Sequence, residues 1–175
     1  MIFRSSGQGL LETIIAIGIV VTGLVGAISL VNFTLRSSSS TVSRMVALNL
    51  AMEGVEVAVN FRDSNYLAVA NFDDVLNGGS DTTAVFDFDE TQNIWFVDFA
   101  PETFADLETQ LFQKGGVYRQ GFAVAPSDRV PTNFRRLITL DNTVEDQIRV
   151  VSTVQWTERQ NTNEISVERT LFNWR

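Results

Sequence analysis

The chain has 175 residues, of which 45% are hydrophobic and 19% are charged, and these proportions are typical of a folded domain rather than a disordered segment. This length accommodates one compact domain and a membrane anchor. The net charge of −8 disfavours nucleic acid as a partner, because an acidic surface repels phosphate. The sequence contains neither cysteine nor histidine, which excludes disulfides, thiolate chemistry and the commonest general base, and we expect no enzymatic activity.

An apolar segment occupies residues 10–35, and Glu12 is its only charge. About 20 apolar residues span a bilayer at a rise of about 1.5 Å per residue, so this segment is long enough. Arg4 precedes it and Arg36 follows it. Because the short basic leader should stay in the cytoplasm, we expect a single pass through the cytoplasmic membrane with the C-terminus outside.

A secretory signal peptide is one alternative for this segment, and an uncleaved anchor with a stray glutamate is another. A signal peptide has a charged start, an apolar stretch of about 7–15 residues and then a small-residue cleavage site. The apolar stretch here is longer, and Glu12 lies near its front. A carboxylate deep in a membrane costs about 2.5–3.5 kcal/mol on insertion scales and serves no targeting purpose, so it requires another explanation.

The run GQGLLE at residues 7–12 supplies an explanation for Glu12. A short basic leader, a glycine, a glutamate as the fifth residue after it and an unbroken apolar helix together resemble a type IV prepilin. The resemblance implies that a prepilin peptidase cuts between Gly7 and Gln8 and methylates the new amino group of Gln8. It also implies that Glu12 pairs with the α-amino group of a neighbouring subunit. A buried carboxylate is tolerated when a cation meets it and is destabilising when alone, so the charge favours the assembled state.

After a polar stretch, residues 41–67 have a pattern typical of a helix, with apolar side chains on two faces. One face comprises Met45, Leu48, Met52, Val55 and Val59. The second face comprises Val46, Leu50, Val57 and Phe61. A helix on a domain surface needs one apolar stripe, so one face should pack on the chain's own sheet and the other needs a partner. We expect the second face to contact neighbouring stem helices in a filament; the alternative is a second layer from the same chain, such as the loop after Tyr66.

Residues 50–67 also resemble a pattern of minor pilins and pilin-like proteins. The pattern is an Ala-x-Glu-Gly stretch, here residues 51–54, followed by the polar and aromatic cluster NFRDSNY at residues 60–66. Judged by its residue types, the cluster is a helix C-terminus, because Arg62 suits the helix dipole and Asp63 to Asn65 are turn formers. A ligand site is the alternative.

The remaining sequence predicts an antiparallel sheet. Strand patterns occupy residues 84–89, 94–99, 117–125, 134–140, 147–157 and 164–174. A short helix is predicted over residues 103–113, and a β-bulge near Arg169, where the alternation slips. Short links between consecutive strands favour a meander with one face to cover. The predicted fold is therefore α+β, with a long N-terminal helix, half transmembrane and half amphipathic, packed on an antiparallel sheet as in type IV pilins.

Acidic residues supply the remaining candidate chemistry. Asp87 and Asp89 form a carboxylate pair, but acid–base work needs a cleft that sequence does not reveal, so a solvated face is favoured. Clustered carboxylate and amide oxygens suit calcium, which some pseudopilins hold. The calcium candidates are Asp73, Asp74, Asn77 and Asp81. No EF-hand spacing, phosphate loop or nucleophile motif is present, and we expect no cofactor.

These features predict a leader at residues 1–7, an assembly helix at 8–36 and a globular domain at 37–175. The expected function is that of a structural subunit of a type IV pilus or related filament. The resemblance implies three partners: prepilin peptidase, other pilin-like subunits and an inner-membrane assembly platform. It also implies a final location in an extracellular filament. The alternatives are a membrane-tethered adhesion module, a subunit of a type II secretion-like pseudopilus and, least favoured, a tethered enzyme.

Overall fold

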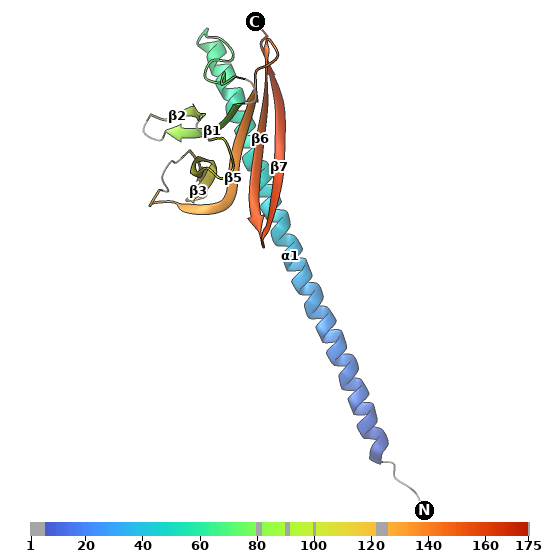
Figure 1. Ribbon diagram of the computed structural model, residues 1–175. Coiled ribbons are helices and arrows are strands. Elements are labelled where there is room, and N and C mark those ends of the chain that lie inside the picture. The colour runs from blue at the N-terminus through green and yellow to red at the C-terminus, as the bar shows by residue number, and fades with distance from the viewer. Residues whose placement is uncertain (1–5, 80–81, 90–91, 100, 122–125, 175) are drawn as a thin grey trace, which may run out of the picture. The chain divides into compact units, whose positions relative to one another are not determined.

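A computed structural model describes residues 6–79, 82–89, 92–99, 101–121 and 126–174. The chain divides into two compact units, Met1–Ser43 and Arg44–Arg175, and helix α1 (Ser6–Leu67) contributes to both. Figure 1 labels the main elements of the chain. After α1 come β1 (Thr82–Asp89), β2 (Ile94–Asp98), the 3-10 turn η1 (Leu107–Thr109), β3 (Gln110–Lys114), β4 (Val117–Arg119), β5 (Val130–Asp141), β6 (Gln147–Glu158) and β7 (Asn161–Phe172).

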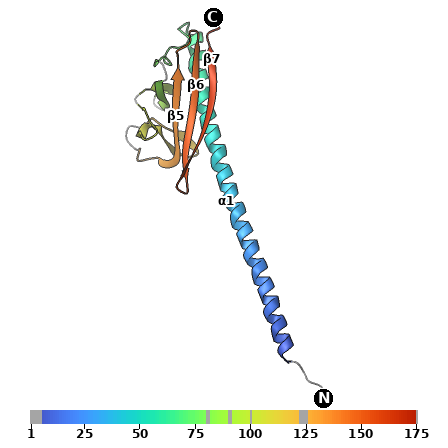
Figure 2. The same cartoon turned by 45° about the vertical axis from the view of Figure 1, so that its right-hand side comes forward.

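The second unit is built on an antiparallel sheet of seven strands, which makes the fold α+β. β5, β6 and β7 each have 12 residues and form the predicted meander. One end of β5 pairs with β1, which forms a hairpin with β2, and the other end pairs with β3, which pairs with β4. Figure 2 shows the C-terminal part of α1 behind β6 and β7. The predicted strands at residues 84–89, 94–99, 134–140 and 147–157 are confirmed.

β6 shows why these residues form a sheet. Its buried positions alternate as predicted, from Ile148 to Trp156, and every second side chain enters the core. The turn into β7 is shorter than residues 158–163, the interval between the two predicted strands. Arg159 and Gln160 have φ angles of 50° and 76°, as in a two-residue type I′ turn, whose twist matches that of the paired strands.

Three sequence predictions need correction. The helix predicted over residues 103–113 is wrong, because only η1 is helical and β3 follows it. There the pairing of β3 with β5 outweighs the local apolar periodicity, and the irregular register between Gln110 and Phe112 accommodates it. The strand predicted over residues 117–125 is confirmed only as β4, and residues 122–125 lie outside the described residues.

The bulge predicted near Arg169 is also wrong. β6 and β7 pair in continuous register from Gln147–Phe172 to Glu158–Asn161. Arg169 keeps its place in the alternation, and its guanidinium pairs with Glu56 of α1 at 3.1 Å. Leu171 lies on the same side of the strand as Arg169 and is fully buried. The charged Arg169 interrupts this apolar row, and the sequence pattern therefore suggested a change of register that the strand does not have.

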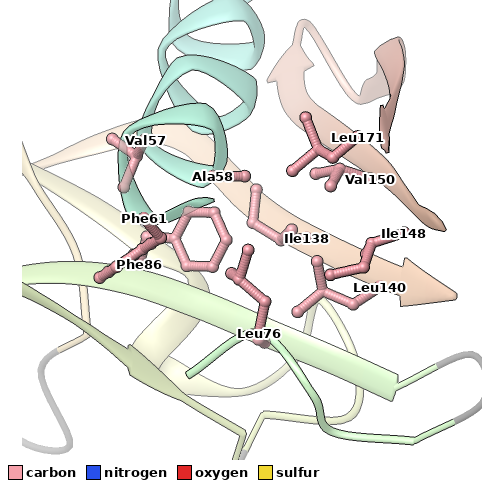
Figure 3. Packing of buried hydrophobic residues seen from close by; sticks show 11 residues of the cluster. Val57, Ala58, Phe61, Leu76, Phe86, Ile138, Leu140, Ile148, Val150 and Leu171 are labelled. Atoms are coloured by element: carbon pink, nitrogen blue, oxygen red, sulfur yellow. The ribbon is translucent and has the colours of Figure 1, made fainter. Parts of the chain in front are cut away.

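The core consists of two clusters along α1. Val57, Ala58 and Phe61 pack among residues of β1, β5, β6 and β7, and the rings of Phe61 and Phe86 meet edge to face at 5.6 Å (Figure 3). About two turns earlier on the helix, Ala47, Leu50 and Ala51 pack on β3, β5 and β6, and the buried side chains there are Leu111, Phe134, Val154 and Trp156. The chain therefore buries the C-terminal third of α1 against the whole length of the meander.

Gly54 sets the distance between α1 and the sheet. A Cβ atom at this position would lie 2.5 Å from Ser152 Oγ and 2.8 Å from Ile138 Cδ1. Such separations are far inside van der Waals contact, so a larger residue requires the side chains of Ser152 and Ile138, or the helix itself, to move. Ala47, Ala51 and Ala58, all fully buried, continue the same line of small residues along the helix.

Gly54→Ala should therefore lower the free energy of unfolding by about 1–3 kcal/mol through overpacking, although alanine is the better helix former. Thermal unfolding of the full chain in detergent measures the effect. In a Ser152→Gly background the same substitution should be less harmful, because one of the two obstructing side chains is gone. Equal or raised stability of Gly54→Ala would show that the helix is not held this close.

Candidate functional site

The part of α1 in the first unit is long and apolar enough to cross a membrane. Its large apolar side chains, from Leu10 to Leu35, are all exposed. Four side-chain hydroxyls interrupt the apolar surface, and each donates a hydrogen bond of 2.8 to 2.9 Å to the carbonyl four residues earlier. These hydroxyls belong to Thr13, Thr22, Ser29 and Thr34. The helix therefore satisfies their hydrogen bonds internally, which lowers the cost of placing them in hydrocarbon.

Glu12 differs from those hydroxyl groups. It is exposed on one helix face beside the apolar side chains of Leu11, Ile15, Ala16 and Ile19. Within the part of the chain that the structure describes, no side chain is recorded as a hydrogen-bond or ion-pair partner of Glu12. The next cation along the helix is Arg36, 24 residues and about 36 Å away. A counter-charge for Glu12 must come from outside the described residues.

The predicted processing site precedes Glu12. Gly7 and Gln8 fall within the bounds of α1, but their side chains are not among those described, and Met1 to Ser5 lie outside the described residues. Cleavage after Gly7 and methylation of Gln8 stay predictions from the sequence.

The stem of α1 in the second unit shows which apolar face enters the core. The prediction that Val46, Leu50, Val57 and Phe61 face neighbouring subunits is wrong. Leu50, Val57 and Phe61 are buried, and Val46 packs against the core cluster that contains Ala47 and Ala51. These residues flank the line of small side chains through Gly54, along which the helix touches the sheet. That line of Ala and Gly residues was the sequence signal that distinguishes the two faces.

The opposite face supplies the exposed residues. Met45, Leu48 and Met52 are 61%, 38% and 48% exposed, and we call these three residues the stem face. Val55, assigned to the same face from sequence, is buried instead, and Val59 is half-buried. Two flexible methionines and a leucine in one row make an adaptable apolar surface on a domain that already has a complete core.

Glu53 belongs to a buried polar network that the sequence did not reveal. Arg136 on β5 is 1% exposed, and its Nη1 donates to the Leu50 carbonyl at 2.9 Å. Its Nε donates to Gln120 Oε1, and Glu53 lies 3.7 Å away as its counter-charge. Burial lowers the pKa of Arg136, while Glu53 raises it. The Ala-x-Glu-Gly stretch thus supplies both the close approach, at Gly54, and the charge that accompanies it.

Asp87 lies near the same network. It is buried, and burial raises the pKa of its carboxyl above the ordinary value, while the Phe88 N–H, Arg119 and Arg129 oppose this rise. Arg136 also interacts electrostatically with Asp87. The carboxylate therefore serves the charge balance of a buried cluster, and Asp89 acts on it only weakly.

The polar and aromatic cluster at residues 60–66 holds the C-terminal end of β7. Tyr66 accepts a hydrogen bond at 3.0 Å from the Trp174 N–H and donates to the Phe172 carbonyl at 3.1 Å. The Tyr66 and Trp174 rings lie 4.4 Å apart, and the Arg62 guanidinium lies 4.1 Å from the Trp174 ring centroid. Asp63 pairs with Arg62 at 2.7 Å. The cluster is thus more than the helix end predicted from sequence, because it fixes the last strand to the helix.

The calcium candidates gain no support from the described residues. Asp73 Oδ2 accepts a hydrogen bond from Asn77 at 2.9 Å, and Asp74 is exposed. Asp81 lies outside the described residues. Among the residues that the structure describes, no group of three carboxylates is placed to hold a metal ion.

No protein-family model, curated protein or solved structure matches the chain. The resemblance to type IV prepilins therefore rests on the sequence patterns at residues 7–12 and 51–66 alone.

Replacing Arg136 with alanine should lower the free energy of unfolding by about 3–5 kcal/mol, because it removes a buried side chain and leaves Gln120 Oε1 without its hydrogen-bond donor. Arg149→Ala is the matched control, since Arg149 is half-exposed and its pair with Glu168 lies on the surface. That control should change stability little. Denaturant unfolding of both full-length variants makes the comparison, and similar losses would contradict the role assigned to Arg136.

Proposed function

We propose that the chain is a structural subunit of a type IV pilus or a related filament. It is inserted in the cytoplasmic membrane as a prepilin, cleaved after Gly7 and assembled through its N-terminal helix. The observation that carries this proposal is Glu12, the only charge in an apolar segment long enough to cross a membrane.

An unpaired carboxylate within hydrocarbon is costly, and a paired one is tolerated. Cleavage after Gly7 would create a positive α-amino group at Gln8, four residues before Glu12. In one helix these two groups follow each other along the axis. In a bundle of parallel helices shifted by about one turn, or 5.4 Å, the Gln8 amine of one copy lies level with Glu12 of another. A cation from the neighbouring copy then lowers the cost of the carboxylate within the membrane, so the pairing favours assembly.

The stem face supports the same function. Met45, Leu48 and Met52 leave an exposed apolar row on the second unit, beyond the segment suited to the membrane. A monomeric domain has no use for this row, whereas a filament covers it with neighbouring chains. The proposed partners are accordingly other pilin-like subunits, the prepilin peptidase and the assembly platform of the membrane.

Glu12→Leu should insert in the membrane as well as wild type but should lose most of its incorporation into filaments, because the amine of the neighbour then finds no carboxylate. Glu12→Gln should show a similar loss, which separates charge from polarity. Thr13→Val is the matched control, since the Thr13 hydroxyl bonds only to the Gly9 carbonyl at 2.8 Å, and this variant should assemble normally. Immunoblots of sheared filaments and membranes measure the distribution. Normal incorporation of Glu12→Leu would end the assembly role.

Co-expression with a prepilin peptidase should remove residues 1–7 and add one methyl group to Gln8. Intact mass spectrometry detects both changes. Gly7→Val should keep the leader, because a branched side chain then stands at the cleavage position, whereas Gly9→Ala should be processed like wild type. A chain that keeps Met1 to Gly7 in the presence of an active peptidase would refute the prepilin assignment.

A further inference from the structure

Val69 occupies a backbone position that ordinarily requires glycine. The end of α1 is closed by two hydrogen bonds, from the Ala70 N–H to the Asn65 carbonyl at 2.9 Å and from the Val69 N–H to the Tyr66 carbonyl at 3.2 Å. These two bonds define a Schellman motif with Val69 at the C′ position. Its φ angle is 58°, in the left-handed region, which is unfavourable for a β-branched side chain.

Val75 repeats the feature six residues later. The Leu76 N–H donates to the Asp73 carbonyl at 2.9 Å, which closes a β-turn with Val75 at its third position. The φ angle of Val75 is 71°, and a turn with a positive φ only at this position favours glycine or asparagine there. Two valines thus stand where the backbone favours glycine.

The packing of the domain does not explain either valine. Val69 is 82% exposed and Val75 is 50% exposed, and the neighbouring Leu67 is 87% exposed. Asparagine or glycine would relieve the backbone strain without loss of a buried contact. Strained conformations persist when the surroundings over-determine them, and they cluster at functional sites.

The surrounding loop is held firmly in this shape. The Asn65 amide donates to the carbonyls of Phe72 and Asp74 at 3.2 and 2.7 Å. Leu76 is fully buried in the core cluster that contains Phe61. Residues 67–75, which we call the post-helix loop, therefore present Leu67, Val69 and Val75 on a fixed backbone, which reduces the entropy lost on binding.

We propose that the post-helix loop of one copy docks on the stem face of a second copy, a contact that rests on the proposed filament function. Both surfaces are apolar. Glu56 lies one turn after Met52, but it pairs with Arg169 of its own chain at 3.1 Å, so its charge is balanced within the copy. At the other end of the stem face, the charges of the two surfaces are complementary. Asp73 and Asp74 precede Val75 in the loop, whereas Arg44 is exposed beside the stem face, one turn of helix before Leu48. A loop-to-loop contact would instead bring the aspartates of both copies together, which disfavours a symmetric dimer through this surface.

Helix geometry agrees with this pairing. Leu48 and Leu67 are 19 residues apart on α1, which corresponds to about 28 Å along its axis. A second copy with parallel stem helices, displaced by about that distance, places its stem face level with the post-helix loop of the first. The contact is heterologous, because it joins two different patches, so it extends from copy to copy instead of closing a dimer.

The absence of cysteine allows a direct test by disulfide cross-linking in the full-length chain. Filaments of the double variant Leu48→Cys with Val69→Cys should, on mild oxidation, give a ladder of cross-linked species beyond the dimer. Each single variant should give at most dimers. The control pair is Leu48→Cys with Thr162→Cys, which uses another exposed residue, at the start of β7, and should give no ladder.

The outcomes separate the two proposals. Filaments that form normally but give no ladder with Leu48→Cys and Val69→Cys would overturn this contact and leave the proposed function standing. Failure of the cysteine-free chain to form filaments would overturn both. A ladder with the Thr162→Cys control as well would show non-specific proximity and would also overturn the contact.

A second measurement tests why the valines are retained. Val69→Gly should raise Tm by about 2–6 °C through relief of strain, and it should reduce the amount of chain in filaments severalfold through loss of the apolar contact. A merely structural role for Val69 would leave filament incorporation unchanged. Unchanged or increased incorporation with a raised Tm would contradict the proposed docking.

Discussion

The close contact between α1 and the sheet at Gly54 determines most of what this domain presents to its surroundings. Because the helix touches β5 and β6 along Ala47, Ala51, Gly54 and Ala58, the larger residues beside that line enter the core. Arg136 reinforces the contact by donating to a helix carbonyl from within the sheet. The stem face is exposed as a consequence, since it lies on the side of the helix that the sheet does not reach.

Three features of the chain are incomplete in a single copy. Glu12 has no recorded counter-charge among the described residues, the stem face has no cover, and the post-helix loop keeps strained valines that contribute nothing to the core. Each feature has a cost in the monomer and a benefit in contact with other chains. The proposed assembly accounts for all three with one physical argument.

The sequence predicted the apolar helix, the meander and the β1–β2 hairpin, because their periodicities are local and strong. It did not predict β3, whose residues pair with β5 across a gap in sequence, and it misread Arg169, whose partner Glu56 lies on the helix. The sequence prediction assigned the two apolar faces of the stem helix the wrong way round, because both have the same periodicity. Only the small residues of the helix mark the side that contacts the sheet. The Arg136 network depends on segments far apart in sequence, so no local pattern reveals it.

A helical reconstruction of filaments formed by this chain tests the central claim most directly. The account predicts that the Glu12 carboxylate lies within ion-pair distance of the α-amino group of Gln8 in a neighbouring copy, inside a bundle of parallel N-terminal helices. A reconstruction in which Glu12 faces solvent or has no cation beside it would contradict the claim that this charge drives assembly.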